Sequence, residues 1–142
     1  MWRAARPDED DAIVAMSLAL FAEDLSPENV TAERVRRTLA MFREHPVRGR
    51  VVVLDVDGRA AGYAFLVNYW SNELGGEICT IDELYIEPAF RGRGHATALL
   101  TSLREGVVAL ELEVTPANVK ARALYERLGF RVKRNAVLRK KF

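Results

Sequence analysis

The segment from Arg91 to Ala96 reads Arg-Gly-Arg-Gly-His-Ala and stands between an apolar, strand-like run and a helix-like run. Glycines lack a Cβ, so backbone N–H groups can come close to a phosphate, and the following helix directs its first N–H groups to the same place. Arg91 and Arg93 add side chains that form charge-assisted hydrogen bonds with phosphate oxygens. His95 is expected to contribute through its backbone, because no catalytic partner stands beside it. These residues predict a phosphate or pyrophosphate site.

Two widespread phosphate-binding loops do not fit this segment. A Walker-type loop requires Lys and then Ser or Thr after its second glycine, and neither is present. A dinucleotide fingerprint, Gly-x-Gly-x-x-Gly, is matched by Gly92 and Gly94, but its third position is Thr97. The segment also stands late in the chain, after a hairpin, whereas that fingerprint opens a doubly wound sheet. A nucleotide-dependent oxidoreductase is therefore the least favoured function.

A third pattern, Arg/Gln-x-x-Gly-x-Gly/Ala, is matched by Arg91, Gly94 and Ala96, and through it the chain resembles the GNAT superfamily of acyl-CoA-dependent N-acetyltransferases. A second stretch, LELEVTPANVKARALYERLGF (residues 110–130), resembles the later half of the family pattern. The two stretches occur in the family's order, so the resemblance covers nearly the whole chain. It implies acetyl-CoA as cosubstrate and no metal.

The resemblance also implies how acetyl-CoA binds. The glycine segment would hold the CoA pyrophosphate, and the strand before it would pair with the pantetheine amides like an added strand. A backbone N–H of the same strand would polarise the thioester carbonyl. The residues expected to bind acetyl-CoA are Leu84, Tyr85, Ile86, Arg91, Gly92, Arg93, Gly94, His95, Ala96 and Asn118.

The catalytic residues implied by the resemblance are a tyrosine and a carboxylate. Tyr125 matches the family's general acid, although its place on the apolar face of a helix also suits a core tyrosine. Glu83 and Asp82 both remain candidates for the general base, and either could act only by attracting a cationic amine. Strict alternation along a strand directs them to opposite faces, Glu83 with Glu77 and Asp82 with Leu84. A central strand should not carry two free carboxylates, so at least one is expected to face a wet cleft or to be paired.

The acceptor is expected to be a primary amine of a small molecule, a protein or a peptide. Aromatic and acidic side chains suit an alkylammonium group, although they equally suit a solvated surface. The candidates are Phe21, Glu23, Asp24, Tyr69, Trp70, Asn72, Glu73 and Glu77. The predicted function is direct acetyl transfer in a ternary complex, and the alternative is a non-catalytic acyl-CoA-binding regulatory module.

The elements that must position these residues follow the order β-α-α-β-β-β-α-β-α-β, in a single domain over residues 1–142. A hairpin turns at Asp57-Gly58, and the final stretch FRVKRNAVLRKKF is expected to form a strand pair or one long strand. The segment TSLREGVVA is shorter than the family commonly has, so the helix after the glycines should be short. The predicted fold class is α/β (α+β mixed): a GNAT-like, mostly antiparallel central sheet with helices on both faces.

Composition excludes several other classes of protein. The net charge of +1, from 21 basic and 20 acidic residues, argues against a nucleic-acid partner. No apolar run approaches the ~18 residues that span a bilayer, and the first residues do not resemble a signal peptide, so a cytoplasmic location without membrane attachment is expected. A single Cys and two distant His residues argue against a metal site. Family members are often dimers, so a homodimer is compatible with the resemblance.

Overall fold

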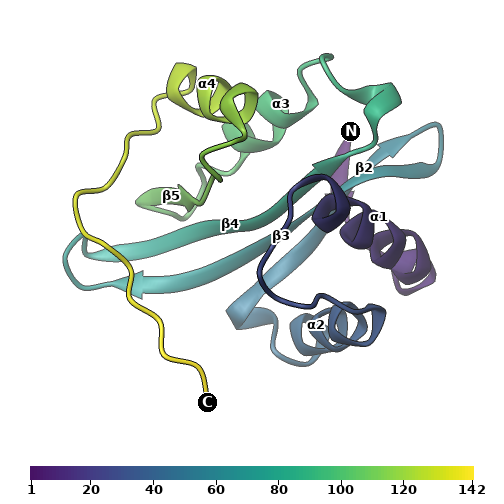
Figure 1. Ribbon diagram of the computed structural model, residues 1–142, viewed down its shortest axis with the longest axis horizontal. Helices are drawn as coiled ribbons and strands as arrows, with labels where there is room; N and C mark the ends of the chain where they lie inside the picture. Colours follow the sequence, from purple (N-terminus) through teal and green to yellow (C-terminus); the bar gives the residue numbers. More distant parts are fainter.

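The computed structural model describes all residues from 1 to 142, and a single sheet of five strands forms its centre (Figure 1). The spatial order of the strands equals their order in the sequence. The first three junctions are antiparallel, whereas β4 and β5 run parallel. The strands are β1 (Trp2–Ala4), β2 (Gly49–Val56), β3 (Arg59–Ser71), β4 (Gly76–Ile86) and β5 (Ala109–Leu112).

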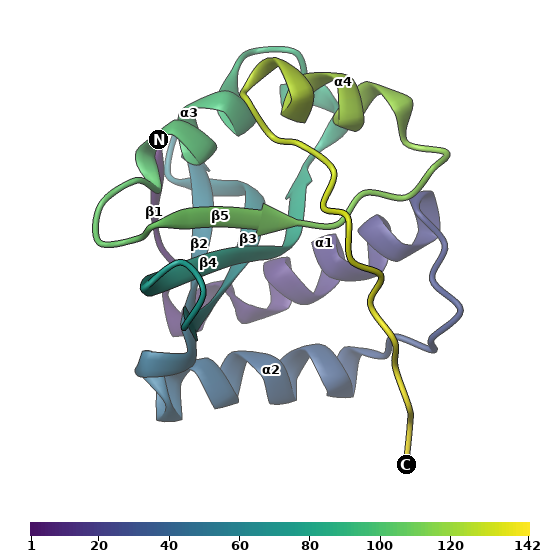
Figure 2. The same ribbon diagram turned by 90° about the vertical axis from the view of Figure 1, so that its left-hand side faces the viewer.

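Helices cover both faces of the sheet, which confirms the predicted fold class. One face carries α1 (Asp10–Glu23) and α2 (Ala32–Glu44), and the other carries α3 (His95–Ser102) and α4 (Val119–Arg127) (Figures 1 and 2). Single turns of 3₁₀-helix lie at Pro7–Glu9, Pro46–Arg48 and Pro88–Phe90. As expected from the short segment after it, α3 has only 8 residues. No helix in the chain combines the length and the apolar character needed to cross a membrane.

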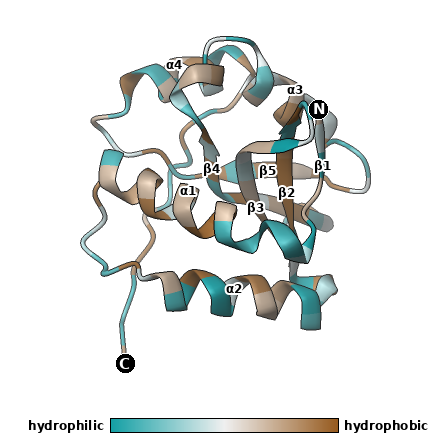
Figure 3. Cartoon of the chain, turned by 90° about the vertical axis from the view of Figure 1, so that its right-hand side faces the viewer, coloured by the Kyte–Doolittle hydropathy of each residue, from teal (hydrophilic) through white to brown (hydrophobic).

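Two apolar clusters hold these layers together, one on each face of the sheet. Helix α2 contributes Val35, Leu39 and Phe42, a helical spacing that places all three side chains on one buried stripe. In Figure 3 this helix alternates between hydrophilic and hydrophobic residues, whereas β2 is largely hydrophobic. On the opposite face, Leu99 and Leu100 of α3 pack against the strands. The site-bearing strand β4 is therefore fixed from both sides.

The turn between β2 and β3 has the conformation that its sequence predicts. Asp57 and Gly58 both adopt positive φ, 53° and 81°, as a two-residue hairpin turn requires. The Asp55 carboxylate accepts a hydrogen bond from the Gly58 N–H at 2.9 Å. This hairpin aligns β3 beside the full length of β4.

A β-bulge interrupts β4 at Asp82. The strict alternation of side chains expected from the sequence is therefore wrong for the residues after it. Phe65 on β3 pairs with Glu83, but the next residue, Leu66, pairs with Ile81, so Asp82 is the extra residue. Before the bulge, Cys79 and Ile81 belong to the cluster under α3 and α4; after it, Leu84 does. Glu83 consequently turns to the α1 face, rather than sharing the face that strict alternation gives to Glu77.

The segment after α4 forms no strand, contrary to the expectation for FRVKRNAVLRKKF. Its titratable residues are all basic, and its apolar residues, including Val137 and Leu138, stay exposed, so pairing would bury little and would concentrate like charge. Side chains attach it instead: Lys133 donates to Glu111 at 3.1 Å and Lys141 to Glu28 at 3.0 Å. Figure 2 shows this segment passing the end of β5 as an extended chain.

Candidate active site

The last residues of β4 have a partner strand on one side only. The short strand β5 pairs with Ile78 through Ile81 and extends no further. The Glu87 N–H donates to the Ala61 carbonyl of β3 at 2.9 Å, and alternation along the strand therefore turns the backbone groups of Leu84 and Ile86 away from β3. We call residues 82–86 the open edge of β4. An open edge of this kind can accept an extended ligand as an additional strand.

The glycine loop (residues 91–96) leads from this edge into α3. Gly92 and Gly94 have φ of 72° and 79°, and an added Cβ at either would meet no atom within 4 Å. The glycines are therefore required by backbone conformation rather than by lack of space. None of the backbone N–H groups from Gly92 to Thr97 donates to an acceptor within the chain. A loop of free donors at a helix N-terminus fits a pyrophosphate group.

The two arginine side chains of the glycine loop make contacts that the sequence did not predict. Arg91 donates to both carboxylate oxygens of Glu23 on α1, at 2.8 and 3.0 Å, and to the Ile86 carbonyl at 2.7 Å. Its guanidinium also lies 5.2 Å from the centre of the Tyr85 ring. Arg93 donates to the Ala89 carbonyl at 2.9 Å. Arg91 thus ties the loop to the end of α1.

The first turn of α3 is fixed from the N-terminal strand. The indole N–H of Trp2 on β1 donates to the His95 carbonyl at 2.8 Å. The contact uses the His95 carbonyl and leaves the His95 N–H without an acceptor in the chain. It also anchors the glycine loop to the edge of the sheet opposite β5 in strand order.

A cleft of about 350 Å³ lies beside the bulge, between the end of α1, β4, the end of β5 and α4. Five residues predicted from the sequence for catalysis or cosubstrate binding line it together, namely Asp82, Glu83, Leu84, Asn118 and Tyr125. Of the residues expected on the acceptor side, Phe21 and Asp24 also line the cleft. The remaining members of that set do not: Glu23 binds Arg91, and Tyr69, Trp70, Asn72, Glu73 and Glu77 lie at the β3–β4 turn, far along β4 from the glycine loop (Figure 1).

Glu83 is the carboxylate with the most enclosed surroundings in this cleft. It accepts hydrogen bonds from the Tyr63 hydroxyl at 2.6 Å and from the Ser17 hydroxyl at 3.2 Å. Burial raises the pKa of Glu83, the Tyr63 hydrogen bond opposes that rise, the charge of Asp82 adds to it, and Ser17 opposes it. A carboxyl with a raised pKa that retains two donors to its charged form suits a general base.

Asp82 and Tyr125 differ from Glu83 in having no hydrogen-bonding partner for their side chains. The bulge leaves Asp82 at the solvent-exposed mouth of the cleft. Partial desolvation by the cleft walls and the negative charge of Glu113 raise the pKa of Asp82, whereas the positive charge of Arg139 lowers it. Tyr125 is partly buried, and this burial raises the pKa of its hydroxyl. Its ring packs against Phe130 with centroids 5.8 Å apart, and the hydroxyl remains available to a ligand.

Asn118 lines the cleft and caps α4, the helix that carries Tyr125. Its side-chain oxygen accepts from the Ala121 N–H at 3.2 Å and so caps α4. The cap fixes the start of the helix whose next two turns present Tyr125. Thr115, just before this cap, donates to the Asp24 carboxylate at 2.9 Å and joins the α4 side of the cleft to the end of α1.

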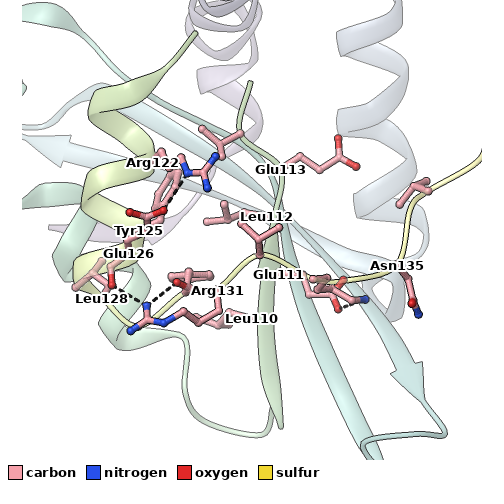
Figure 4. Close-up of a pocket in the computed structure, with 16 residues that line it drawn as sticks. Leu110, Glu111, Leu112, Glu113, Arg122, Tyr125, Glu126, Leu128, Arg131 and Asn135 are labelled. Carbon is pink, nitrogen blue, oxygen red and sulfur yellow. Dashed lines mark hydrogen bonds and ion pairs between the residues drawn. The ribbon is translucent and has the colours of Figure 1, made fainter. Parts of the chain in front are cut away.

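A larger pocket of about 760 Å³ lies on the other side of Tyr125 (Figure 4). Its walls come from β5, α4 and the segment after α4, with Leu110, Leu128 and Arg131 among them. Arg122 and Glu126 of α4 also line it and form an ion pair at 2.9 Å. Figure 4 marks this pair with a dashed line. Neither the glycine loop nor the carboxylates of β4 reach this pocket, so the smaller cleft is the candidate active site.

Sequence reasoning missed the two hydroxyls that hold Glu83. Tyr63 lies in an apolar run after the Asp57-Gly58 turn, and neither Tyr63 nor Ser17 belongs to a motif that predicts a site. A signal existed for Ser17, since it lies between Ile13 and Leu20 on the face of α1 that packs on the sheet. A hydroxyl on such a face needs a buried partner. No comparable signal marked Tyr63, because a tyrosine is common in strands.

Comparison with known proteins identifies the family. Residues 14–130 match the model of the acetyltransferase (GNAT) family. The chain belongs to the GNAT acetyltransferase family. The matched residues include the open edge of β4, the glycine loop and the whole of α4, and of the residues lining the candidate cleft only Arg139 lies outside them.

Individual GNAT relatives and solved structures agree with this assignment. The mycothiol acetyltransferase of Propionibacterium freudenreichii subsp. shermanii is 32% identical over 135 residues, which cover 89% of this chain and 41% of that protein. This chain thus corresponds to less than half the length of that relative. A possible acetyltransferase from Clostridium difficile 630 has the same fold, with a TM-score of 0.84 at 19% identity over 100% of this chain and 97% of the other. A predicted acetyltransferase from Clostridium acetobutylicum, solved with acetyl-CoA, has a TM-score of 0.78 at 17% identity, with 99% and 95% covered.

Proposed function

We propose that this GNAT protein transfers the acetyl group of acetyl-CoA to a primary amine by direct attack in a ternary complex. The observation that carries the proposal is the convergence of three features on one cleft: the open edge of β4, the partly buried carboxylate of Glu83 and the free hydroxyl of Tyr125. The glycine loop, with its unpaired N–H groups, continues from the same edge. Each feature alone has other uses, but acyl transfer from a long, phosphate-bearing thioester requires all of them.

The cosubstrate side of the proposal rests mainly on backbone groups. The N–H groups of Gly92 to Thr97 bind the pyrophosphate, and the outward-facing groups of Leu84 and Ile86 pair with the pantetheine amides. Arg91 already donates to the Ile86 carbonyl, but a carbonyl oxygen has two lone pairs and can accept a second donor. Acetyl-CoA, when bound, supplies the acyl group as an activated thioester. A backbone N–H at the open edge then stabilises the negative charge that develops on its carbonyl oxygen.

The chemical step needs a base and an acid on opposite sides of the reacting carbon. Glu83 accepts a proton from the ammonium form of the acceptor, directly or through one water, and the neutral amine forms the new C–N bond. As the C–S bond breaks, the Tyr125 hydroxyl gives its proton to the leaving sulfur. The products are the N-acetyl amide and CoA thiol. The second proton lost by the nitrogen restores the Tyr125 hydroxyl, and Glu83 releases the first to solvent, so that one proton is set free in each turnover.

Between the two carboxylates, the surroundings favour Glu83 as the base. Its position is fixed by two hydroxyls, whereas Asp82 projects at the mouth without a partner. Asp82 is better suited to attracting the amine before it reacts. A cationic acceptor is favoured by the charges of the cleft, where Arg139 is the single basic residue in the lining and the acidic residues are Asp24, Glu28, Asp82, Glu83 and Glu113.

The test is a thiol-release assay with acetyl-CoA and a panel of monoamines, diamines, amino acids and peptide N-termini. Turnover with at least one amine is expected, and Tyr125→Phe should lower kcat by about 10²–10⁴ without weakening CoA binding measured by calorimetry. If CoA binds tightly to the wild type but no amine gives turnover, the protein is a non-catalytic acyl-CoA-binding module and the proposed activity is wrong.

A further inference from the structure

Glu83 meets two hydroxyl groups from two other elements at a single oxygen atom. The Tyr63 hydroxyl of β3 and the Ser17 hydroxyl of α1 both donate to Oε2, at 2.6 and 3.2 Å. Both residues are 0% exposed, so neither donor can turn to water instead. The other oxygen, Oε1, has no partner within the chain. The carboxylate is thus held by one oxygen and free at the other.

The position of the Tyr63 hydroxyl is set by the apolar core rather than by the cleft. Its ring packs edge-on against Phe65, with centroids 5.1 Å apart, and lies 6.4 Å from the ring of Tyr85. Phe42 of α2 packs in turn against Phe65. A ring enclosed in this way cannot swing aside, because a close-packed interior has no space to receive it. The hydroxyl is therefore a rigid donor at the base of the cleft.

The bulge at Asp82 is what delivers Glu83 to these donors. Without the extra residue, Glu83 would fall on the face of α3 and α4, where the strand buries Cys79 and Ile81 among apolar side chains. With it, Glu83 reaches the α1 face, where Ser17 and Tyr63 lie. Three separate features (a bulge, a core tyrosine and a serine on a buried helix face) converge on one carboxylate oxygen.

We propose that Tyr63 and Ser17 are positioning residues, which hold Oε2 of Glu83 so that Oε1 alone receives the proton of the acceptor amine. This inference rests on the proposed function and names how its base is oriented. Neither hydroxyl touches the reacting atoms; both act through Glu83. If these buried hydroxyls only filled space, an apolar side chain could replace either of them without effect on proton transfer. If they position Glu83, the same replacement slows proton transfer.

The same hydroxyls tune the charge of Glu83. Burial is the largest influence and raises its pKa, while the two hydrogen bonds stabilise the charged form and lower it. Removal of the Tyr63 hydroxyl should therefore raise the pKa of Glu83 further, and a larger fraction of the base would be protonated at neutral pH. Asp82 lies beside Glu83 in the sequence. The other titratable groups that line the same cleft are Asp24, Glu28, Glu113, Tyr125 and Arg139.

The variants Tyr63→Phe and Ser17→Ala test this inference, with Leu39→Ala as the matched control. Leu39→Ala weakens the same apolar cluster from α2 but removes no donor to Glu83. Two quantities are measured on each full-length protein: the pKa of Glu83, from the ¹³C shift of its carboxyl carbon assigned with Glu83→Gln, and kcat against pH at saturating acetyl-CoA and amine. The NMR titration does not depend on turnover.

For Tyr63→Phe the pKa of Glu83 should rise, and kcat at pH 6 should fall about tenfold and recover toward the wild-type value at pH 9. Ser17→Ala should show the same changes at smaller size, because its hydrogen bond is longer. Leu39→Ala should lower the melting temperature but leave both the pKa of Glu83 and the shape of the pH profile unchanged.

Several results would overturn the inference, and they can be told apart from failure of the proposed function. An unchanged pKa of Glu83 in Tyr63→Phe, or a loss of kcat that is equal at every pH, would assign these hydroxyls to packing alone. A raised pKa with an unchanged pH profile would show that Glu83 is not the base, although acetyl transfer itself would stand. Absence of turnover in the wild type would reject both proposals.

Discussion

The glycine loop and the carboxylate cleft lie next to each other on β4, yet they are built in different ways. The loop and the first turn of α3 present backbone N–H groups from six consecutive residues, Gly92 to Thr97, and the two glycines contribute by having no side chain. The cleft presents side chains from α1, β3, β4 and α4, each supplied by a different packing contact. A site made of backbone tolerates change in its surroundings, whereas a site made of converging side chains depends on the whole core.

Arg91 is the direct connection between these two regions. It belongs to the glycine loop, but its side chain binds Glu23 at the end of α1 and lies over the ring of Tyr85 on the open edge of β4. Both partners of the Arg91–Glu23 pair are about half exposed, so the pair adds little to stability. Its effect is geometric, because it fixes where the loop leaves the sheet.

The largest expected effect comes from breaking the side-chain site while leaving the backbone site intact. Glu83→Gln keeps the volume and one acceptor oxygen for Tyr63 but removes the base, so kcat should fall by about 10²–10⁴. The dissociation constant for CoA, measured by calorimetry, should stay unchanged because no donor of the glycine loop moves. A large loss of CoA affinity would show that the two regions are not separable.

The next effect comes from breaking the backbone site alone. Gly94→Val places a β-branched residue at a φ of 79°, which costs about 1–2 kcal/mol and shifts the N–H groups at the start of α3. CoA should bind about tenfold more weakly, a change that calorimetry resolves. Gly75→Val is the matched control, because Gly75 has a φ of 70° at the distant β3–β4 turn. It should cost similar stability without affecting CoA, and equal weakening by both variants would refute a specific role for the loop.

A smaller effect, on the melting temperature, distinguishes Glu83, which lies in the candidate active site, from Glu9, which stabilises the fold. The Arg3 side chain lowers the pKa of Glu9, so Glu9 contributes stability above the unfolded-state pKa and loses it as pH falls through its folded value. Burial raises the pKa of Glu83, so its contribution is present below the unfolded pKa and is lost as pH rises through the folded value. At pH 7, Glu9→Gln should lower the melting temperature, whereas Glu83→Gln should raise it by about 2–4 °C. Thermal unfolding at pH 7 and pH 4 checks both signs, and a drop for Glu83→Gln at pH 7 would contradict them.

The smallest effect is expected from the segment after α4. Lys141 pairs with Glu28 at the wall of the cleft, but 66% of its side chain is exposed. Lys141→Ala should therefore change the free energy of unfolding, measured in urea, by less than about 1 kcal/mol. A larger loss would mean that this segment supports the cleft rather than passing beside it.

How far the sequence predicted the site follows from the same difference in construction. The glycine loop was predicted because its donors are consecutive residues. Gly92 and Gly94 also indicate the positive φ angles that the loop needs. The hairpin at Asp57-Gly58 and the order of the helices were predicted for the same local reason.

The arrangement around Glu83 was not predictable, because a bulge is a property of two strands and their register. The sequence around Asp82 and Glu83 does not show which residue is left unpaired by the bulge. The face of the sheet on which each carboxylate lies therefore could not be predicted. Tyr63 and Ser17 became visible only when β3 and α1 were packed on β4. The prediction of a final strand was wrong. Basic side chains of this segment bind carboxylates directly, as Lys133 does with Glu111, and this attachment needs no backbone hydrogen bonds to a neighbouring strand.

The central claim is direct transfer from acetyl-CoA to an amine held in the cleft beside Glu83. Its most direct test is a single turnover with acetyl-CoA labelled in the acetyl group, followed by mass spectrometry of both the amine and the intact chain. We expect the label to pass to the amine, with no labelled protein at any time, and Glu83→Gln to slow this transfer. An acetylated form of the chain that precedes the product, or a transfer rate unaffected by Glu83→Gln, would contradict the central claim.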